Sequence, residues 1–231
     1  MGIDADLYPV SLIVANQPCL VVGGGRVAAR KVSSLLRCGA DVSMVAPEAH
    51  VALGLLTQEG AFDRLQGPHL KVHLRAYEKG EASAYRLVVT ATGVAAVDAL
   101  VFADAQSAGV WVNSADDPEH CTFVLPAVTR QGPVTVAVST GGNSPALASW
   151  LRSRVAELIG PDLGQLAGLL DDARGRIHAR GASTESVDWE AVLQGPLPTL
   201  VRQGHLAEAV ELLNGIVDSA GPAPGQAINP P

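Results

Sequence analysis

Apolar positions recur with two different periods in the first half of the chain. Short apolar runs typical of strands alternate with longer stretches whose apolar residues recur at helical spacing. The predicted strands cover residues 19–22, 41–45, 70–74, 87–91 and 110–112. The predicted helices between them cover residues 26–38, 51–59 and 95–107. This alternation predicts an α/β fold with a parallel sheet and helices on both of its faces.

The pattern changes after Asn113. Two β-rich runs, 122–128 and 134–140, are joined by the turn-like residues 129–133, and we expect them to form an antiparallel pair. A glycine-rich turn then opens a helix whose first position suits Pro145. The helical period continues to residue 213, with breaks at 160–161, 181 and 195–196.

These changes of period predict four parts in the chain. They are an α/β domain over 1–113, a β segment over 114–143, a helical domain over 144–220 and a tail over 221–231. Four prolines fall within the last ten residues, so we expect the tail to be disordered.

The net charge and the low aromatic content of the chain argue against a nucleic-acid partner. The chain has 16 Lys and Arg against 23 Asp and Glu, a net charge of −7, and three each of Phe, Trp and Tyr. Such a chain lacks the phosphate-neutralising and stacking surfaces of a nucleic-acid-binding protein. The uncharged stretch 7–25 contains Asn16, Gln17, Pro18 and three glycines, so it predicts neither a membrane span nor a signal peptide. Three cysteines without a CxxC pair favour a reducing cytoplasm and no zinc site.

A dinucleotide-binding fingerprint lies between the first predicted strand and helix. The run Gly23-Gly24-Gly25-Arg26-Val27-Ala28 fits G-x-G-x-x-A. In that pattern Gly23 makes the tight turn, Gly25 lets the backbone approach a pyrophosphate, and Ala28 keeps the helix close to the strand. The place of the ribose-binding acid holds Pro47 and Glu48, and no Arg stands there for a 2′-phosphate, which favours NAD over NADP. Glu48 also fits a solvated residue in the first turn of a helix.

Two later segments are candidates for chemistry. Asp116 follows the fifth predicted strand, in the crevice where doubly wound sheets bind ligands, although Asp116-Asp117-Pro118 also fits a plain turn. The segment 140–144 offers free amides and hydroxyls to a carboxylate, or is simply a turn with a helix cap. Basic residues at 174–180 suit carboxylates too, with a solvated helix face as the alternative.

Three motifs together resemble one enzyme family. They are VVGGGRVAARK, VNSADDPEHCTFVLPAV and VAVSTGGNSPALASWLR, and the likeness runs in order from about residue 7 to residue 175. The chain resembles the precorrin-2 dehydrogenase / sirohydrochlorin ferrochelatase family, which includes the N-terminal half of sirohaem synthases. The resemblance implies a homodimer with intertwined β segments and NAD-dependent oxidation of precorrin-2 to sirohydrochlorin. Some members also insert ferrous iron.

The resemblance also implies roles for individual residues. Asp116 falls at the family's catalytic aspartate. The residues that match its nucleotide contacts are Gly23, Gly25, Arg26, Val27, Pro47, Glu48 and Thr92. The residues that match its substrate segments are Asn113, Thr140, Gly141, Gly142 and Ser144. This chain departs from the family at Gly93, where an acidic residue or Asn is frequent, and at Ser114-Ala115, where an apolar pair is frequent.

The sequence therefore predicts a cytoplasmic, NAD-dependent precorrin-2 dehydrogenase of sirohaem biosynthesis, with its tetrapyrrole between the nucleotide-binding and helical domains. No dedicated metal-ligand cluster is predicted. One alternative is a bifunctional enzyme that also inserts Fe²⁺ or Co²⁺ into sirohydrochlorin. Others are a nucleotide-sensing regulatory module without chemistry of its own and an S-adenosylmethionine methyltransferase that uses the glycine loop.

Overall fold

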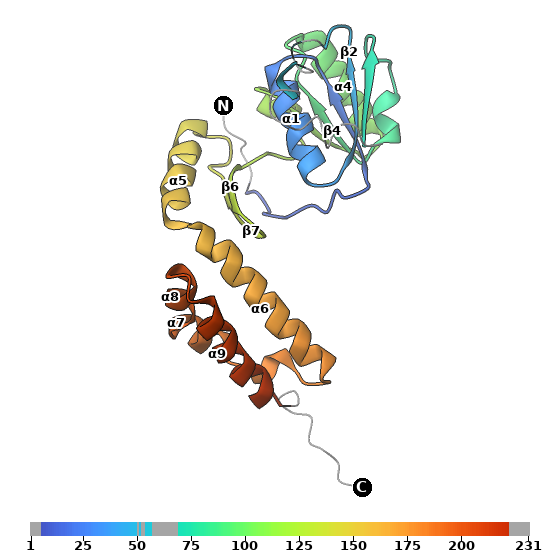
Figure 1. Ribbon diagram of the computed structural model, residues 1–231. Helices are drawn as coiled ribbons and strands as arrows, with labels where there is room; N and C mark the ends of the chain where they lie inside the picture. The colour runs from blue at the N-terminus through green and yellow to red at the C-terminus, as the bar shows by residue number, and fades with distance from the viewer. Residues whose placement is uncertain (1–5, 50, 52–53, 57–68, 222–231) are drawn as a thin grey trace. The chain divides into compact units, whose positions relative to one another are not determined.

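Contacts within the chain divide it into two compact units. The computed structural model describes residues 6–49, 51, 54–56 and 69–221. One unit comprises Met1–Leu125 with Thr140–Ser144, and the other comprises Pro126–Ser139 with Pro145–Pro231 (Figure 1). The predicted boundaries at residues 113 and 143 stay predictions.

The first unit contains a five-stranded parallel sheet in the order β3-β2-β1-β4-β5. Its strands are β1 (Pro18–Val22), β2 (Asp41–Ala46), β3 (Leu70–Leu74), β4 (Leu87–Thr90) and β5 (Trp111–Ser114). This order is that of a Rossmann-like fold, in which ligands bind beyond the carboxyl ends of the strands. The predicted fold class is confirmed.

Alternate residues of β1 and β4 enter two separate cores, so these central strands carry apolar residues on both faces. Val21 and Val89 pack with residues of α1 (Arg26–Arg37), whereas Leu20 and Val88 pack with residues of α4 (Ala95–Ser107). The described residues of the unit also include two short 3₁₀ helices, η1 (Glu81–Ala84) and η2 (Pro118–His120).

The second unit joins a hairpin to a set of helices. The strands β6 (Ala127–Gln131) and β7 (Val134–Val138) are antiparallel. The helices are α5 (Pro145–Leu158), α6 (Pro161–Ala179), η3 (Thr184–Ser186), α7 (Trp189–Gln194), α8 (Leu197–Arg202) and α9 (Leu206–Ser219). The helices α6 and α9 lie side by side around Ile177 and Leu213, which are buried in a core of their own (Figure 1).

The predicted hairpin differs from the observed one in its first strand. That strand begins at Ala127 instead of residue 122, because Thr122 is held at the edge of β5. The Thr122 N–H donates to the Val112 carbonyl, and the Val112 N–H donates to the Thr122 hydroxyl. The turn is also tighter than predicted, since Gln131 already pairs with Val134 and Gly132 has a φ of +55°.

The predicted strands and helices of residues 18–114 and the second strand of the hairpin agree with the structure to within two residues at their ends, where they can be compared. The prediction was wrong in the helical part of the chain. Residues 182–188 contain only the short η3, Gly204 with a φ of +78° ends α8 at an unpredicted break, and α9 runs to Ser219 instead of ending at residue 213. The predicted helix 51–59 and the predicted disordered tail fall largely outside the described residues. Within the parts of the chain that the structure describes, no helix is long and apolar enough to cross a membrane.

Candidate active site

The first glycine of the fingerprint makes a turn that excludes a side chain. Gly23 follows β1 with a φ of +134°, and its N–H donates to the Val45 carbonyl at 2.9 Å. A Cβ at Gly23 would lie within 3.0 Å of the Ala91 carbonyl oxygen, closer than real Cβ atoms come. The tight-turn role predicted for Gly23 is therefore confirmed.

The second glycine, Gly24, also leaves no room for a side chain, and the sequence did not predict this. A Cβ at Gly24 would meet the Glu48 carbonyl oxygen well inside 3.0 Å. The loop after β2 thus lies directly against the glycine loop. The fingerprint leaves this position open, so the run of three glycines was the single sequence signal available.

The third glycine borders open space at the start of α1. No atom of the described residues lies within 4 Å of a Cβ built at Gly25. The first helical hydrogen bond runs from the Ala29 N–H to the Gly25 carbonyl, which leaves the amides of Arg26 and Val27 without helical acceptors. Among the described residues no side chain caps this end. Free amides, the positive helix end and open space fit the pyrophosphate of a dinucleotide.

The loops after β2 and β4 reach the same edge of the sheet. Pro47 and Glu48 are exposed directly after β2, and the Glu48 backbone contacts the glycine loop. Thr92 lies after β4, next to the Ala91 carbonyl that approaches Gly23. The structure therefore brings the predicted nucleotide contacts together, although their individual roles stay predictions.

Asp98 on α4 organises the loop after β4, and the sequence analysis did not single it out. This carboxylate is 9% exposed and accepts hydrogen bonds from the Thr90 hydroxyl, the Thr92 hydroxyl and the Thr92 N–H. An acid in the first turn of a helix after a strand was its sequence signal. Gly93 follows with a φ of +72°, a conformation that suits Gly and that Asn also tolerates.

Asp116 lies in a constrained turn after β5. It is exposed and has a φ of +63°, which is uncommon for a residue other than glycine. The thiol of Cys121 braces this turn, since it accepts from the Ser114 N–H and lies 3.3 Å from the Ser114 and Asp117 carbonyl oxygens. Burial raises the pKa of the Cys121 thiol, as expected for a packed side chain.

Hydrogen bonds and a ring contact fix the residues around the Asp116 turn. Asn113 is buried, and its amide donates to the Phe123 carbonyl at 3.0 Å. His120 contacts the Asp117 carboxylate at 2.6 Å, and this hydrogen bond holds the pKa of Asp117 below its ordinary value. The His120 ring also packs edge-to-face on Phe102 of α4. Asn113 thus has a structural role beside the substrate contact that the resemblance implies.

Lys31 of α1 belongs to the electrostatic surroundings of Asp116. Burial lowers the pKa of this ammonium and the charge of Arg30 lowers it further, whereas Asp116 and Cys121 act in the opposite direction. The helix that begins at the glycine loop therefore also places a cation within electrostatic reach of the Asp116 turn. The sequence did not predict a functional role for Lys31, because two neighbouring basic residues in a helix have no distinctive pattern.

The second candidate segment is a compact turn. The Thr140 hydroxyl accepts from the Ser144 N–H and donates to the Ser144 carbonyl. Gly141 and Gly142 both have positive φ values, +61° and +79°. These bonds satisfy the turn internally, and a substrate contact through Thr140, Gly141, Gly142 or Ser144 stays a prediction.

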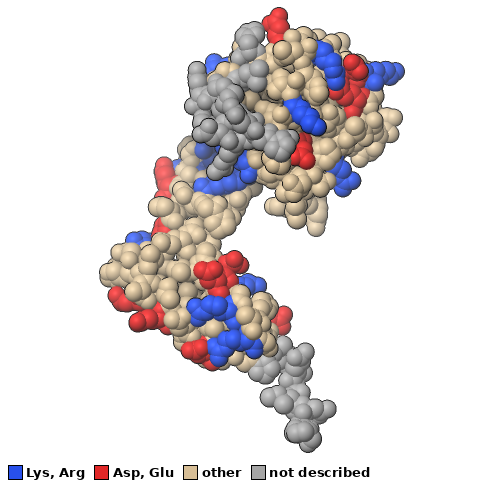
Figure 2. Space-filling model, turned by 45° about the vertical axis from the view of Figure 1, so that its right-hand side comes forward, with Lys and Arg blue, Asp and Glu red and all other residues tan. Residues whose placement is uncertain are grey.

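Two basic residues at the C-terminal end of α6 contact α9. Arg176 donates to the Asn214 side chain at 2.6 Å, and Arg180 forms an ion pair with Asp218, both on α9. On the face drawn in Figure 2, Lys and Arg side chains are interspersed with Asp and Glu side chains. Among the residues that the structure describes, no three His, Cys, Asp or Glu side chains group closely enough to hold a metal ion.

Comparisons with known proteins place these features in a family. A family model described as putative NAD(P)-binding matches residues 10–127, and one described as the central part of sirohaem biosynthesis proteins matches residues 131–158. The chain is 36% identical over 217 residues to the siroheme synthase of Methylococcus capsulatus, covering 93% of this chain and 44% of that protein. It is 37% identical over 220 residues to that of Nitrosomonas eutropha, covering 92% and 44%.

The fold is also similar to that of a solved structure. The match to "SirC, precorrin-2 dehydrogenase" has a TM-score of 0.64 and 22% identity, and it covers 92% of this chain and 99% of that one. The chain spans less than half the length of the siroheme synthases that it matches. Because the NAD(P)-binding model covers half of the sequence, the chain belongs to the putative NAD(P)-binding family, and the resemblance indicated by its motifs is confirmed.

Proposed function

We propose that this chain oxidises precorrin-2 to sirohydrochlorin with NAD⁺ in sirohaem biosynthesis. The most direct support is that the glycine loop and the Asp116 turn lie at the same edge of the sheet. The uncapped glycine loop lies at the carboxyl end of β1, and the constrained Asp116 turn lies at the carboxyl end of β5. A cofactor and an acid–base group at one edge are what a dehydrogenase requires. A nucleotide-sensing module would need the first feature and not the second.

The oxidation removes a hydride and a proton from the macrocycle. When bound, NAD⁺ supplies the hydride acceptor. The amides at the start of α1 would hold the pyrophosphate. The Glu48 carboxylate would accept hydrogen bonds from the ribose hydroxyls, and this contact favours NAD over NADP. A carboxylate oxygen of Asp116 accepts the proton and returns it to solvent, to which Asp116 is exposed. The products are sirohydrochlorin, NADH and one proton.

The substrate is a polycarboxylate. We propose that the segment Thr140–Ser144 and Asn113 bind the carboxylates at the rim of its macrocycle. This segment groups with the nucleotide-binding unit and directly precedes the first amides of α5. The positive end of a helix dipole attracts carboxylates without a net positive field. The assignment is an expectation for this chain and rests on the matched motifs.

We further propose that the chain is a cytoplasmic homodimer joined through β6 and β7. β6 and β7 form a separate sheet of two strands, so each strand has an edge without a strand partner among the described residues. A second copy pairing with it would remove its unpaired edges. Sedimentation should give twice the 23.8 kDa of one chain.

Anaerobic incubation with precorrin-2 and NAD⁺, followed by absorbance, tests the oxidation. Sirohydrochlorin should appear together with NADH, and NAD⁺ binding without oxidation would favour the sensing module. Fe²⁺ or Co²⁺ added afterwards tests the bifunctional alternative, in which the metal ion is a substrate. That alternative is favoured by the name siroheme synthase of the relatives.

Asp116→Asn tests the acid–base role. The variant should fold and bind NAD⁺ as the wild type does, and its turnover should fall at least about 100-fold because proton transfer is lost. Glu119→Gln is the matched control, since Glu119 is an exposed acid three residues away. Turnover of the Asp116→Asn variant within twofold of the control would remove Asp116 from the mechanism.

A further inference from the structure

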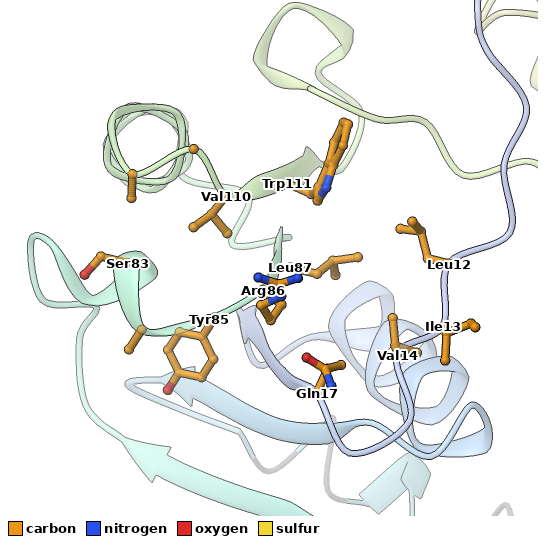
Figure 3. A pocket seen from close by; sticks show the side chains of 13 residues that line it. Leu12, Ile13, Val14, Gln17, Ser83, Tyr85, Arg86, Leu87, Val110 and Trp111 are labelled. Carbon is orange, nitrogen blue, oxygen red and sulfur yellow. The ribbon is translucent and has the colours of Figure 1, made fainter.

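A pocket lies at the end of the sheet opposite the glycine loop. It has a volume of about 610 Å³ and lies at the amino ends of β4 and β5 (Figure 3). The segment before β1 contributes Leu12 and Val14, and the start of β5 contributes Trp111. Ligand pockets commonly have volumes of roughly 300–1,000 Å³, so this hollow is large enough for a small molecule.

Its walls expose large apolar side chains. Trp111 is 52% exposed and Leu12 is 48% exposed, although both face a pocket that also has buried apolar residues such as Leu87. Trp111 and Leu12 belong to none of the three hydrophobic cores, and the proposed dehydrogenation does not use them. Indole and aliphatic surfaces of this kind favour a planar apolar ligand, because aromatic rings stack on Trp and bury much area.

The lining of the pocket includes the cationic side chain of Arg86. Arg86 precedes β4, and Figure 3 shows its side chain in the middle of the pocket, between Tyr85 and Trp111. Its backbone N–H bonds to the Pro18 carbonyl. Within the described part of the chain, however, its guanidinium has neither an ion pair nor a hydrogen bond, whereas Arg75 nearby in sequence is paired with Glu81. Arg86 is exposed, and a guanidinium at the mouth of a pocket with both polar and apolar walls suits the two oxygens of a carboxylate.

We propose that this pocket binds a planar aromatic carboxylate, with the carboxylate on Arg86 and the ring system against Trp111. Strands rise about 3.3 Å per residue, so the pocket lies on the order of 15 Å along the sheet from the glycine loop. The site is therefore independent of the nucleotide and of the proposed oxidation. Polar groups of Gln17, Ser83 and Tyr85 at its border would select among substituted rings.

Calorimetry with 2-naphthoate tests the proposal. The wild-type chain should bind it saturably below about 1 mM, and Arg86→Gln should weaken binding about 10- to 100-fold, the range for loss of a charged hydrogen-bonding group. The neutral isostere 2-naphthamide should lose a similar factor on the wild type. Trp111→Ala should also weaken binding, and saturating NAD⁺ should leave it unchanged.

Arg130→Gln is the matched control, since Arg130 is an exposed arginine on β6 outside the pocket. Far-UV circular dichroism should show that all variants fold. Three results would each overturn the proposal: no saturable binding by the wild type, equal binding of acid and amide, or an Arg86→Gln variant that binds like the control. Displacement of 2-naphthoate by NAD⁺ would do so too, because it would locate the ligand at the nucleotide edge.

Discussion

The three consecutive glycines after β1 serve two different purposes. Gly23 and Gly24 each face a carbonyl oxygen from a neighbouring loop, Ala91 and Glu48 respectively. Gly25 faces open space and has an extended conformation that other residues adopt. The first two glycines therefore serve the packing of loops, and the third serves access to the amides of α1.

Alanine at the second and third positions should separate these purposes. Gly24→Ala should destabilise the protein by about 1–3 kcal/mol or more, because the Glu48 backbone must move. Gly25→Ala should change the unfolding free energy by no more than about 0.5 kcal/mol, yet weaken NAD⁺ binding, because its Cβ enters the space assigned to the pyrophosphate. Urea unfolding and calorimetry with NAD⁺ measure both effects. Equal unfolding midpoints for Gly24→Ala and the wild type would contradict the packing argument.

Asp98 is a second position where a single side chain supports a loop. Asp98→Ala should cost about 1–3 kcal/mol, because the Thr90 hydroxyl is buried and would lose its acceptor. The NAD⁺ affinity should fall as well, since Thr92 would no longer be held. Gln106→Ala on the exposed side of the same helix is the control. The interpretation fails if both variants unfold at the same urea concentration.

At the scale of elements, an ion pair fastens η1 to the chain that follows β3. The Arg75 guanidinium donates to both carboxylate oxygens of Glu81, at 2.7 and 3.0 Å. This contact holds the pKa of Glu81 below its ordinary 4.5, although partial burial acts against it. A carboxyl whose folded-state pKa is lowered stabilises the fold above the unfolded-state value, and this contribution disappears as pH falls through the folded-state pKa.

Glu81→Gln should therefore have a pH-dependent effect. At about pH 7 the variant should melt below the wild type, and at about pH 3 the two melting temperatures should converge, since the wild-type carboxyl becomes protonated. Thermal unfolding followed by circular dichroism at both pH values provides the measurement. Glu78→Gln, which alters a longer and more exposed contact to Arg75, should show a smaller difference. A gap that persists undiminished at low pH would exclude the ion pair as its cause.

At the scale of the whole molecule, the net charge opposes the proposed substrate. A chain with a net charge of −7 must bind a polycarboxylate through local amides and a few cations. The range of such interactions shortens from about 10 Å at 0.1 M salt to about 3 Å at 1 M. The KM for precorrin-2 should consequently rise with salt, and steady-state rates at several NaCl concentrations measure it. A KM independent of salt would indicate apolar binding instead.

Local patterns in the sequence determined most of the elements and the positions of Gly23, Gly25 and Asp116. This was possible because strand and helix periods, turn residues and the glycine fingerprint each lie within a short stretch of chain. The late start of β6 could not be predicted in this way, since it depends on a bond between Thr122 and the separate strand β5.

Only the tertiary structure decided which residues support the site from a distance. Gly24 matters because the Glu48 carbonyl arrives from the next loop, and Asp98 matters because β4 brings Thr90 beneath α4. The pocket at Arg86 likewise exists because three separate segments meet at one end of the sheet. Strand pairing creates these contacts between residues far apart in the chain, and the periodicity of a sequence records burial without recording the partner.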